Sequence, residues 1–401
     1  MKKIFEYFHL KDIGIYEILF ALYPILVGYK YSFPVFALLL IVMAIWGFMK
    51  NHKSINYPKS LLWLTIYVLI HEVVLRMLLN KVPGYFDNNL LSYAIVFVSI
   101  PFIASALNYK KLVGSINWVA IVCMIGLIYQ YIVMMAGGEV HPIKLPFMPD
   151  MDVTSRLYSI LMRPSSFFWE PQSYCSFMMV PQFLAFSEKK MAWAAIITLS
   201  MLLSGSTTGI ITSAVIILLY IFSEEISKKV RNRLIIIAVA IGCTFIFSSL
   251  FDKGREKMEN VDYESTSRLY NGPTLVAHMP ISDFVFGGVS ASVPDYYFEG
   301  KAPGAILLEK FDTIYVSTIW FAIVKLGLVG FILYLAVYIQ PMRNNKNIRF
   351  YLIPLIATLF SNPDFIGPVF AFEFIFIYSF IRNNKNYNIH ESTYINDAVC
   401  Q

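Results

Sequence analysis

The sequence predicts an all-α protein that crosses a membrane many times. Of its 401 residues, 57% are hydrophobic and only 14% are charged, and the mean hydropathy is +0.61. Soluble domains carry about 25% charged residues, so a soluble fold of this size cannot hide so much apolar surface. In lipid, helices satisfy their own backbone hydrogen bonds. We therefore expect one integral membrane domain over residues 1–401.

Apolar segments of suitable length recur along the whole chain. A helix needs roughly 20 apolar residues to cross the hydrocarbon core of a bilayer. About twelve spans are predicted, at 14–30, 32–49, 60–79, 90–108, 112–136, 172–187, 191–204, 207–222, 234–250, 313–339, 350–361 and 367–381. Two of them, 191–204 and 350–361, are short enough to re-enter the membrane instead of crossing it.

Every second connection between these spans is basic. The basic groups are Lys50, Lys53 and Lys59; Lys110 and Lys111; Lys189 and Lys190; Lys228, Lys229, Arg231 and Arg233; Arg343, Lys346 and Arg349; and Arg382 and Lys385. Lysine and arginine in short loops mark the cytoplasmic side. Both termini are therefore expected in the cytoplasm of a multi-pass protein, with the N-terminal run retained as a signal anchor.

Several chemistries are disfavoured by what the chain does not contain. Its four cysteines, Cys123, Cys175, Cys243 and Cys400, lie in or beside predicted spans or in the cytoplasmic tail, which argues against a disulfide framework. No CxxC, HExxH or P-loop motif occurs. We expect no cofactor, no metal site and no nucleic-acid partner, and we assign the net charge of +6 to the inner face.

Two connections, 137–172 and 251–312, are long and fall on the outer side. A protein that only spans a membrane has no need of such loops, so they are expected to form a site above the bilayer. The first contains RPSSFFWEP, with Arg163, Glu170 and Pro171. Pro164 disfavours helical geometry at Arg163, so this guanidinium can project toward an anion beside a carboxylate. The alternative is that Arg163 simply pairs with Glu170.

Further arginines support an anion site. Arg156 lies on a predicted amphipathic helix at the outer leaflet. In the second loop, Arg268 precedes Gly272, where glycine permits close approach by a ligand. Alternatively, Arg268 pairs with Glu264 on the surface. His278 follows in the same loop.

Charged groups inside the predicted spans are costly and need partners. Glu72 and Arg76 are spaced as a helical pair, and Lys325 and Glu373 are assigned to each other. Arg76 also lies near the outer end of its span, beneath the two loops. The small residues of LSGSTTG at 203–209 are read as close helix packing and not as ligand contact.

The order RPSSFFWEPQSY, an apolar span, LSGSTTG and an outer loop with SRLYNGP resembles the Wzy-type polymerases. These belong to the O-antigen polymerase and ligase superfamily of bacterial inner membranes. The resemblance covers essentially the whole chain through short, degenerate motifs. The stretch from Arg268 to Gly272 is similar to the family's Arg-x-x-x-Gly motif, and Arg163 with Glu170-Pro171 is similar to its Arg…Glu-Pro element.

This resemblance implies a GT-C-like architecture and a metal-independent glycosyltransferase. The donor would be a polyprenyl-pyrophosphate-linked oligosaccharide on the periplasmic side, and the partners would be membrane lipid, a chain-length regulator and a flippase. Arg163 and Arg268 would bind the pyrophosphate together, with His278 preferred over Glu170 as the base. Tyr174 and Tyr270 would stack on sugars, unless such aromatic residues only anchor helices at the interface.

Other functions stay open at this point. A ligase would move the finished glycan to lipid A core or another acceptor. A flippase for lipid-linked oligosaccharide would be expected to have internal repeats, and none is found. A non-catalytic scaffold would not depend on the outer arginines.

Overall fold

The computed structural model describes residues 6–31, 35–51, 55, 57–75, 88–151, 163–222, 231–232, 235, 272–273, 275–287, 316–360 and 365–399. Its helices are α2 (Ile15–Leu26), α3 (Val35–Asn51), α4 (Lys59–Ile70), a π-helical turn (His71–Leu75), α6 (Asn88–Ala106), α7 (Tyr109–Met135), α9 (Pro171–Ser187), α10 (Met191–Leu203), α11 (Thr207–Ile221), α15 (Ile281–Phe286), α18 (Thr318–Asn344), α19 (Arg349–Thr358) and α20 (Pro368–Val399). Within these ranges the only β-type pairing is an isolated bridge between Tyr29 and Met151. The all-α prediction is confirmed for this part of the chain.

Each predicted span except 234–250 overlaps one of these helices; of 234–250 only residue 235 is described. By length and composition, two described helices can cross a membrane, Tyr109–Met135 and Thr318–Arg343, with mean hydropathies of 2.1 and 2.2. Other apolar helices, such as α10 and α19, have 10–17 residues. The finer prediction of twelve spans is therefore taken up below as a proposal.

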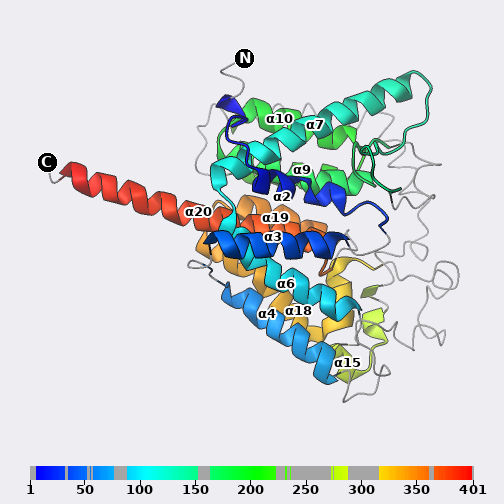
Figure 1. Cartoon of the computed structure of the whole chain (residues 1–401). Helices are drawn as coiled ribbons and strands as arrows, with labels where there is room; N and C mark the ends of the chain where they lie inside the picture. Colours follow the sequence, from blue (N-terminus) through cyan, green and yellow to red (C-terminus); the bar gives the residue numbers. More distant parts are fainter. Residues whose placement is uncertain are drawn as a thin grey trace.

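The helices run back and forth between two ends of a bundle (Figure 1). At one end, which we call the basic end, Lys50 Nζ donates to Ala106 O at 3.1 Å. There too, Lys190 Nζ donates to Tyr7 O, and the Ser60 amide donates to the Gln340 side chain at 2.9 Å. These contacts join the end of α3 to the end of α6, the α9–α10 turn to the N-terminal segment, and the start of α4 to the last turns of α18.

The opposite end, which we call the loop end, gathers the described parts of the two long connections (Figure 1). The Lys30 amide donates to Asp150 O at 2.7 Å, which ties the start of the first long connection to the end of α2. Beyond Asp150, residues 163–170 return to the bundle and lead into α9. The short helix α15, from the second long connection, lies at the same end.

Helix α18 is broken by a glycine in the middle of its length. Gly327 has φ +66°, in the left-handed region. A Cβ there would lie 2.4 Å from Gly287 N, so two glycine backbones touch where α15 meets α18. The Tyr67 hydroxyl donates to Leu326 O at 2.7 Å. A kink leaves helix carbonyls without their usual partners, and Tyr67 of α4 satisfies one of them.

Candidate functional site

The Gln130 side chain of α7 is one of the groups that hold the segment 163–170 in place. Its Oε1 accepts hydrogen bonds from the amides of Ser165 and Ser166 at 3.0 and 2.7 Å. Its Nε2 donates to His141 O at 2.6 Å. Ser165 and Ser166 are fully buried, and Ser166 has φ +57°. Because buried amides need partners, Gln130 allows this irregular segment to enter the bundle.

Further contacts join Ser166 of the same segment to α7 and to the first long connection. The Ser166 hydroxyl donates to Cys123 O at 2.7 Å, and the Ile143 amide donates to Ser166 O at 2.7 Å. A Cβ on Gly126 would lie 2.5 Å from Ser166 Oγ. Glycine on α7 is therefore what allows the segment to approach so closely.

Arg163, at the beginning of this segment, lies against the turn between α10 and α11. Its Nη1 donates to Gly205 O at 3.2 Å. Gly205 has φ +65°, and a Cβ built there would lie 3.3 Å from Arg163 Cδ. The structure thus brings together two motifs that the sequence separates by some forty residues, RPSSFFWEP and LSGSTTG. Arg163 is half-buried, and its guanidinium Nη1 is bonded to this turn.

Glu170, at the other end of the segment, is the N-cap residue of α9 and is 8% exposed. Its backbone is extended, and Pro171 occupies the first turn, where proline lacks only an amide that the helix does not use. The N-terminus of a helix favours negative charge. Glu170 and Arg163 are thus placed at the loop end by opposite ends of one rigid segment.

Tyr174 differs from the prediction that it stacks on a sugar. Its side chain is completely buried, and its ring packs edge-on against Phe168 with centroids 5.9 Å apart. It lies one turn inside α9, on the face that packs in the core. Trp169, by contrast, is half-buried, and its ring contacts Gly28 at the end of α2. Of these two aromatic residues, only Trp169 is open at the loop end.

The LSGSTTG stretch packs helices closely, as predicted. A Cβ on Gly209 would lie 2.4 Å from Cys175 Sγ, so α9 and α11 touch at this point. Cys175 Sγ also lies 3.1 Å from Ser204 Oγ. The hydroxyls of Ser204 and Thr212 donate to backbone carbonyls of their own helices, at 2.7 and 2.8 Å.

The second long connection is placed elsewhere on the loop end. α15 lies at the bottom of the view in Figure 1, whereas α9 and α10 lie toward the top. His278 is exposed just before α15. The space that a Cβ would take at Gly272 is filled by Trp320, 2.3 Å away, so the close approach expected of a ligand is made by an indole ring. α15, which begins three residues after His278, packs against α18 at Gly327, whereas the Arg163 segment packs against α7 and the turn between α10 and α11.

Four predicted site residues lie outside the described residues: Arg76, Arg156, Arg268 and Tyr270. The predicted pairing of Arg163 with Arg268 therefore stays a prediction. Glu72, predicted to pair with Arg76, is 1% exposed and lies 3.5 Å from His71 Nδ1 in the π-helical turn. Lys325 is 8% exposed and stands 5.2 Å from the centre of the Phe321 ring. Among the described residues, no group of three or more His, Cys, Asp or Glu side chains can hold a metal ion.

An exposed ion pair in the outer connection lowers the pKa of one carboxylate. Lys144 Nζ lies 2.7 Å from Asp150 Oδ1, and this ion pair lowers the pKa of Asp150 below its ordinary value of 3.8. The pair is exposed to solvent and lies beside the bond that joins Asp150 O to Lys30. It marks the loop end as a surface that carries both signs of charge.

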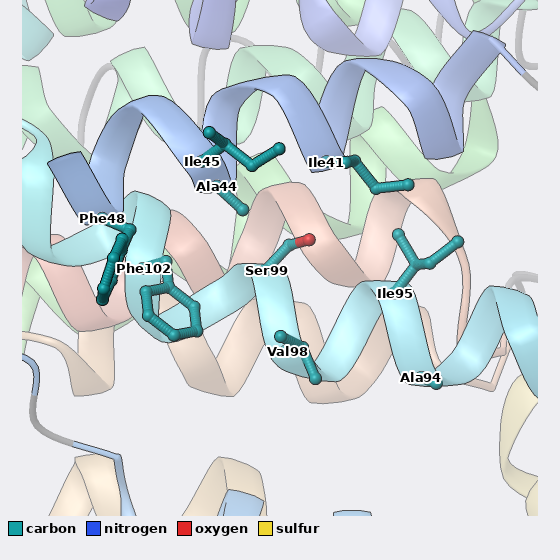
Figure 2. Close-up of a pocket in the computed structure, with 9 residues that line it drawn as sticks. All are labelled: Ile41, Ala44, Ile45, Phe48, Ala94, Ile95, Val98, Ser99 and Phe102. Atoms are coloured by element: carbon teal, nitrogen blue, oxygen red, sulfur yellow. The ribbon is translucent and has the colours of Figure 1, made fainter.

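A groove of about 420 Å³ runs between α3 and α6 (Figure 2). It is lined by Ile41, Ala44, Ile45, Phe48, Ala94, Ile95, Val98, Ser99 and Phe102. No lining residue is charged. Ser99 is the one polar residue among those that line it.

Sequence reasoning did not find Gln130, because a lone glutamine in an apolar helix matches no motif. A scan against models of known protein families gave no match to this chain, and a search of curated proteins gave none either.

Proposed function

We propose that this protein is a membrane-embedded glycosyltransferase that polymerises a polyprenyl-pyrophosphate-linked glycan. The growing chain would be transferred to the next lipid-linked repeat unit at the loop end. The observation that carries the proposal is the segment 163–170, which places an arginine and a carboxylate at the mouth of the bundle and is fixed by Gln130. Catalysis by preorganised charge requires charged groups that are held in place before the reaction.

The proposed roles of the site residues follow from the charge that develops on the leaving group during transfer. When the bond between the anomeric carbon and the pyrophosphate breaks, negative charge accumulates on the leaving group, and a guanidinium can stabilise it with two parallel hydrogen bonds. Arg163 would supply this contact, together with Arg268. The hydroxyl of the acceptor needs a base within reach. Glu170 lies on the same segment as Arg163, and for this reason we now prefer Glu170 to His278 as the base.

The membrane arrangement belongs to the same proposal. The basic end would face the cytoplasm and the loop end the periplasm of a bacterial inner membrane, because short basic loops stay inside. Reporter fusions after Lys111, Lys190 and Arg233 are expected to report cytoplasm. Fusions near Asp150 and Asp295 are expected to report periplasm. Long connections found on opposite sides would exclude the twelve-span arrangement.

The function is tested by the glycan that a deletion strain displays. A polymerase is indicated if a single repeat unit remains on the acceptor, and restoration of the full ladder by the wild-type chain completes the test. Undecorated core with accumulated lipid-linked polymer would indicate a ligase instead. Complete loss of exported glycan would indicate a flippase.

A further inference from the structure

A small cavity lies at the loop end between α2, α9 and α20. It has a volume of about 30 Å³ and is lined by Pro24, Val27, Trp169, Ser173, Ser176, Phe177, Pro368, Val369, Phe372 and Glu373. Trp169 and Ser173 flank Glu170 on either side in the sequence, so this cavity adjoins the candidate site. A polar cavity needs about 10–15 Å³ to hold a water molecule, and this one has room for it.

Glu373 is the one carboxylate among these lining residues, and it is 6% exposed. The hydroxyl-bearing Ser173 and Ser176 line the same space from the first turns of α9. A buried water molecule needs two to four polar partners, and Ser173, Ser176 and Glu373 are lining residues that carry such groups. Ionisable side chains within apolar helix bundles mark functional sites because placing them there is costly.

Two tyrosines on neighbouring helices also lie near Glu373. Tyr338 of α18 and Tyr351 of α19 are both close enough to Glu373 to interact with it electrostatically. The Tyr338 hydroxyl is 2.9 Å from that of Tyr334. From α2 and α9, the residues that line the cavity carry no charge. Glu373 therefore stands between the cavity and a group of tyrosines in the core.

We propose that Glu373 exchanges protons with the loop end through water held in this cavity. Its role in catalysis rests on the proposed function. The acceptor oxygen forms a bond to the anomeric carbon, and the bond from that carbon to the pyrophosphate breaks, leaving its electron pair on the pyrophosphate. The proton of the acceptor hydroxyl passes first to the Glu170 carboxylate, the base of the proposed function. Glu170 then gives this proton to the cavity water, which gives one of its own protons to the Glu373 carboxylate. Release of that proton to the loop end restores the site.

The first experiment is independent of transfer activity. Infrared spectra of the full chain in lipid vesicles are recorded while the outer pH is changed and water is exchanged for deuterium oxide. We expect a carboxyl band that titrates, that is absent in Glu373→Gln and that exchanges more slowly in Ser176→Leu, which fills the cavity. Glu72→Gln, which changes another buried carboxylate, should keep the band. A spectrum unaltered by Glu373→Gln would overturn the proposal.

The second experiment measures polymer formation as a function of pH. Loss of a proton acceptor lowers rates by about 10²–10⁴-fold. Glu373→Gln is therefore expected to lower kcat to this extent, to change the pH profile and to leave KM for the lipid-linked donor near the wild-type value. Unchanged kcat and pH profile would exclude the catalytic role. A wild-type chain that forms no polymer but retains the titrating band would refute the proposed function and leave the proton site standing.

Discussion

The Arg163 segment and the α3–α6 groove show two different ways in which helices pack in a very apolar chain. Around the segment, Ser166 donates hydrogen bonds to Gln130 and Cys123 of α7, and Arg163 donates one to Gly205 in the turn between α10 and α11. The side chains that line the groove are apolar except for Ser99 (Figure 2). Apolar contact gives little direction in lipid, because lipid tails are as apolar as the side chains. Directional bonds are therefore the better guide to a functional site here.

The groove has a structural cause of its own. α3 and α6 are joined at the basic end, where Asn51 Nδ2 donates to Ser105 O at 2.7 Å. There also, a Cβ on Gly47 would lie 2.6 Å from Phe102 O. Farther along, exposed side chains such as Ile45 and Val98 line the open groove. Polar bonds thus fix the geometry of the Arg163 segment, whereas the groove is lined by exposed apolar side chains.

The largest expected effect is on catalysis at Arg163. Arg163→Lys keeps the charge but loses the planar fork of donors. Loss of such a transition-state contact costs roughly 3 kcal/mol, about 100-fold in rate. Polymer synthesis by membranes checks this. Arg349→Lys is the matched control, since Arg349 Nε also donates to a backbone carbonyl, Met342 O at 2.9 Å, but at the basic end. Equal rates of polymer synthesis by the two variants would contradict the special role proposed for Arg163.

The next effect is on stability at Gln130. Gln130→Leu leaves two buried amides, those of Ser165 and Ser166, without their acceptor. An unsatisfied buried group costs about 1–3 kcal/mol, so unfolding in detergent should occur at clearly lower temperature. Gln182→Leu should cost less, because the Gln182 amide nitrogen donates to one side chain, Thr198, at 2.7 Å. The comparison fails if the Gln182 variant is the less stable of the two.

A smaller effect is expected where α9 and α11 touch. Gly209→Ala places a methyl group against Cys175 Sγ, and overpacking of this kind costs about 1–3 kcal/mol. Gly367→Ala meets no atom within 4 Å and should unfold like the wild type. Adding Cys175→Ala to Gly209→Ala should recover part of the loss by removing the sulfur. Thermal unfolding of the three variants provides the measurement, and an absence of recovery would place the clash elsewhere.

The groove should respond weakly to substitution. The side chain of Ile45 is 54% exposed, and exposed substitutions usually change stability by less than about 0.5 kcal/mol. Ile45→Ala is therefore expected to leave the unfolding temperature and polymer synthesis near wild type. A loss as large as that of Gln130→Leu would show that the groove has a specific occupant.

The smallest effect concerns the exposed pair of Lys144 and Asp150. Because the pKa of Asp150 is lowered in the folded chain, the pair stabilises the fold above pH 3.8, and this contribution is lost as the pH falls through the folded pKa. At neutral pH, Asp150→Asn should be slightly less stable than the wild type, and the difference should vanish in acid. Unfolding measured at several pH values, at low salt, tests the sign.

Local patterns predicted much of what the structure contains. Hydropathy located the helices, since a run of apolar residues is a property of neighbouring positions. The alternation of basic connections anticipated that Lys50 and Lys190 would lie at one end. Arg163 and Glu170 could be placed together because only a few residues separate them, and Pro171 indicated where the next helix begins.

The tertiary structure alone decided which side chains meet across long distances in the chain. It put Gln130 beneath Ser166, buried Tyr174, filled the space beside Gly272 with Trp320 and opened a cavity at Glu373. Apolar periodicity carries no information about such pairs, because nearly every face of these helices is apolar. Their partners are selected by close packing and by the need of each buried polar group for a hydrogen bond, and both become visible only when the helices are assembled.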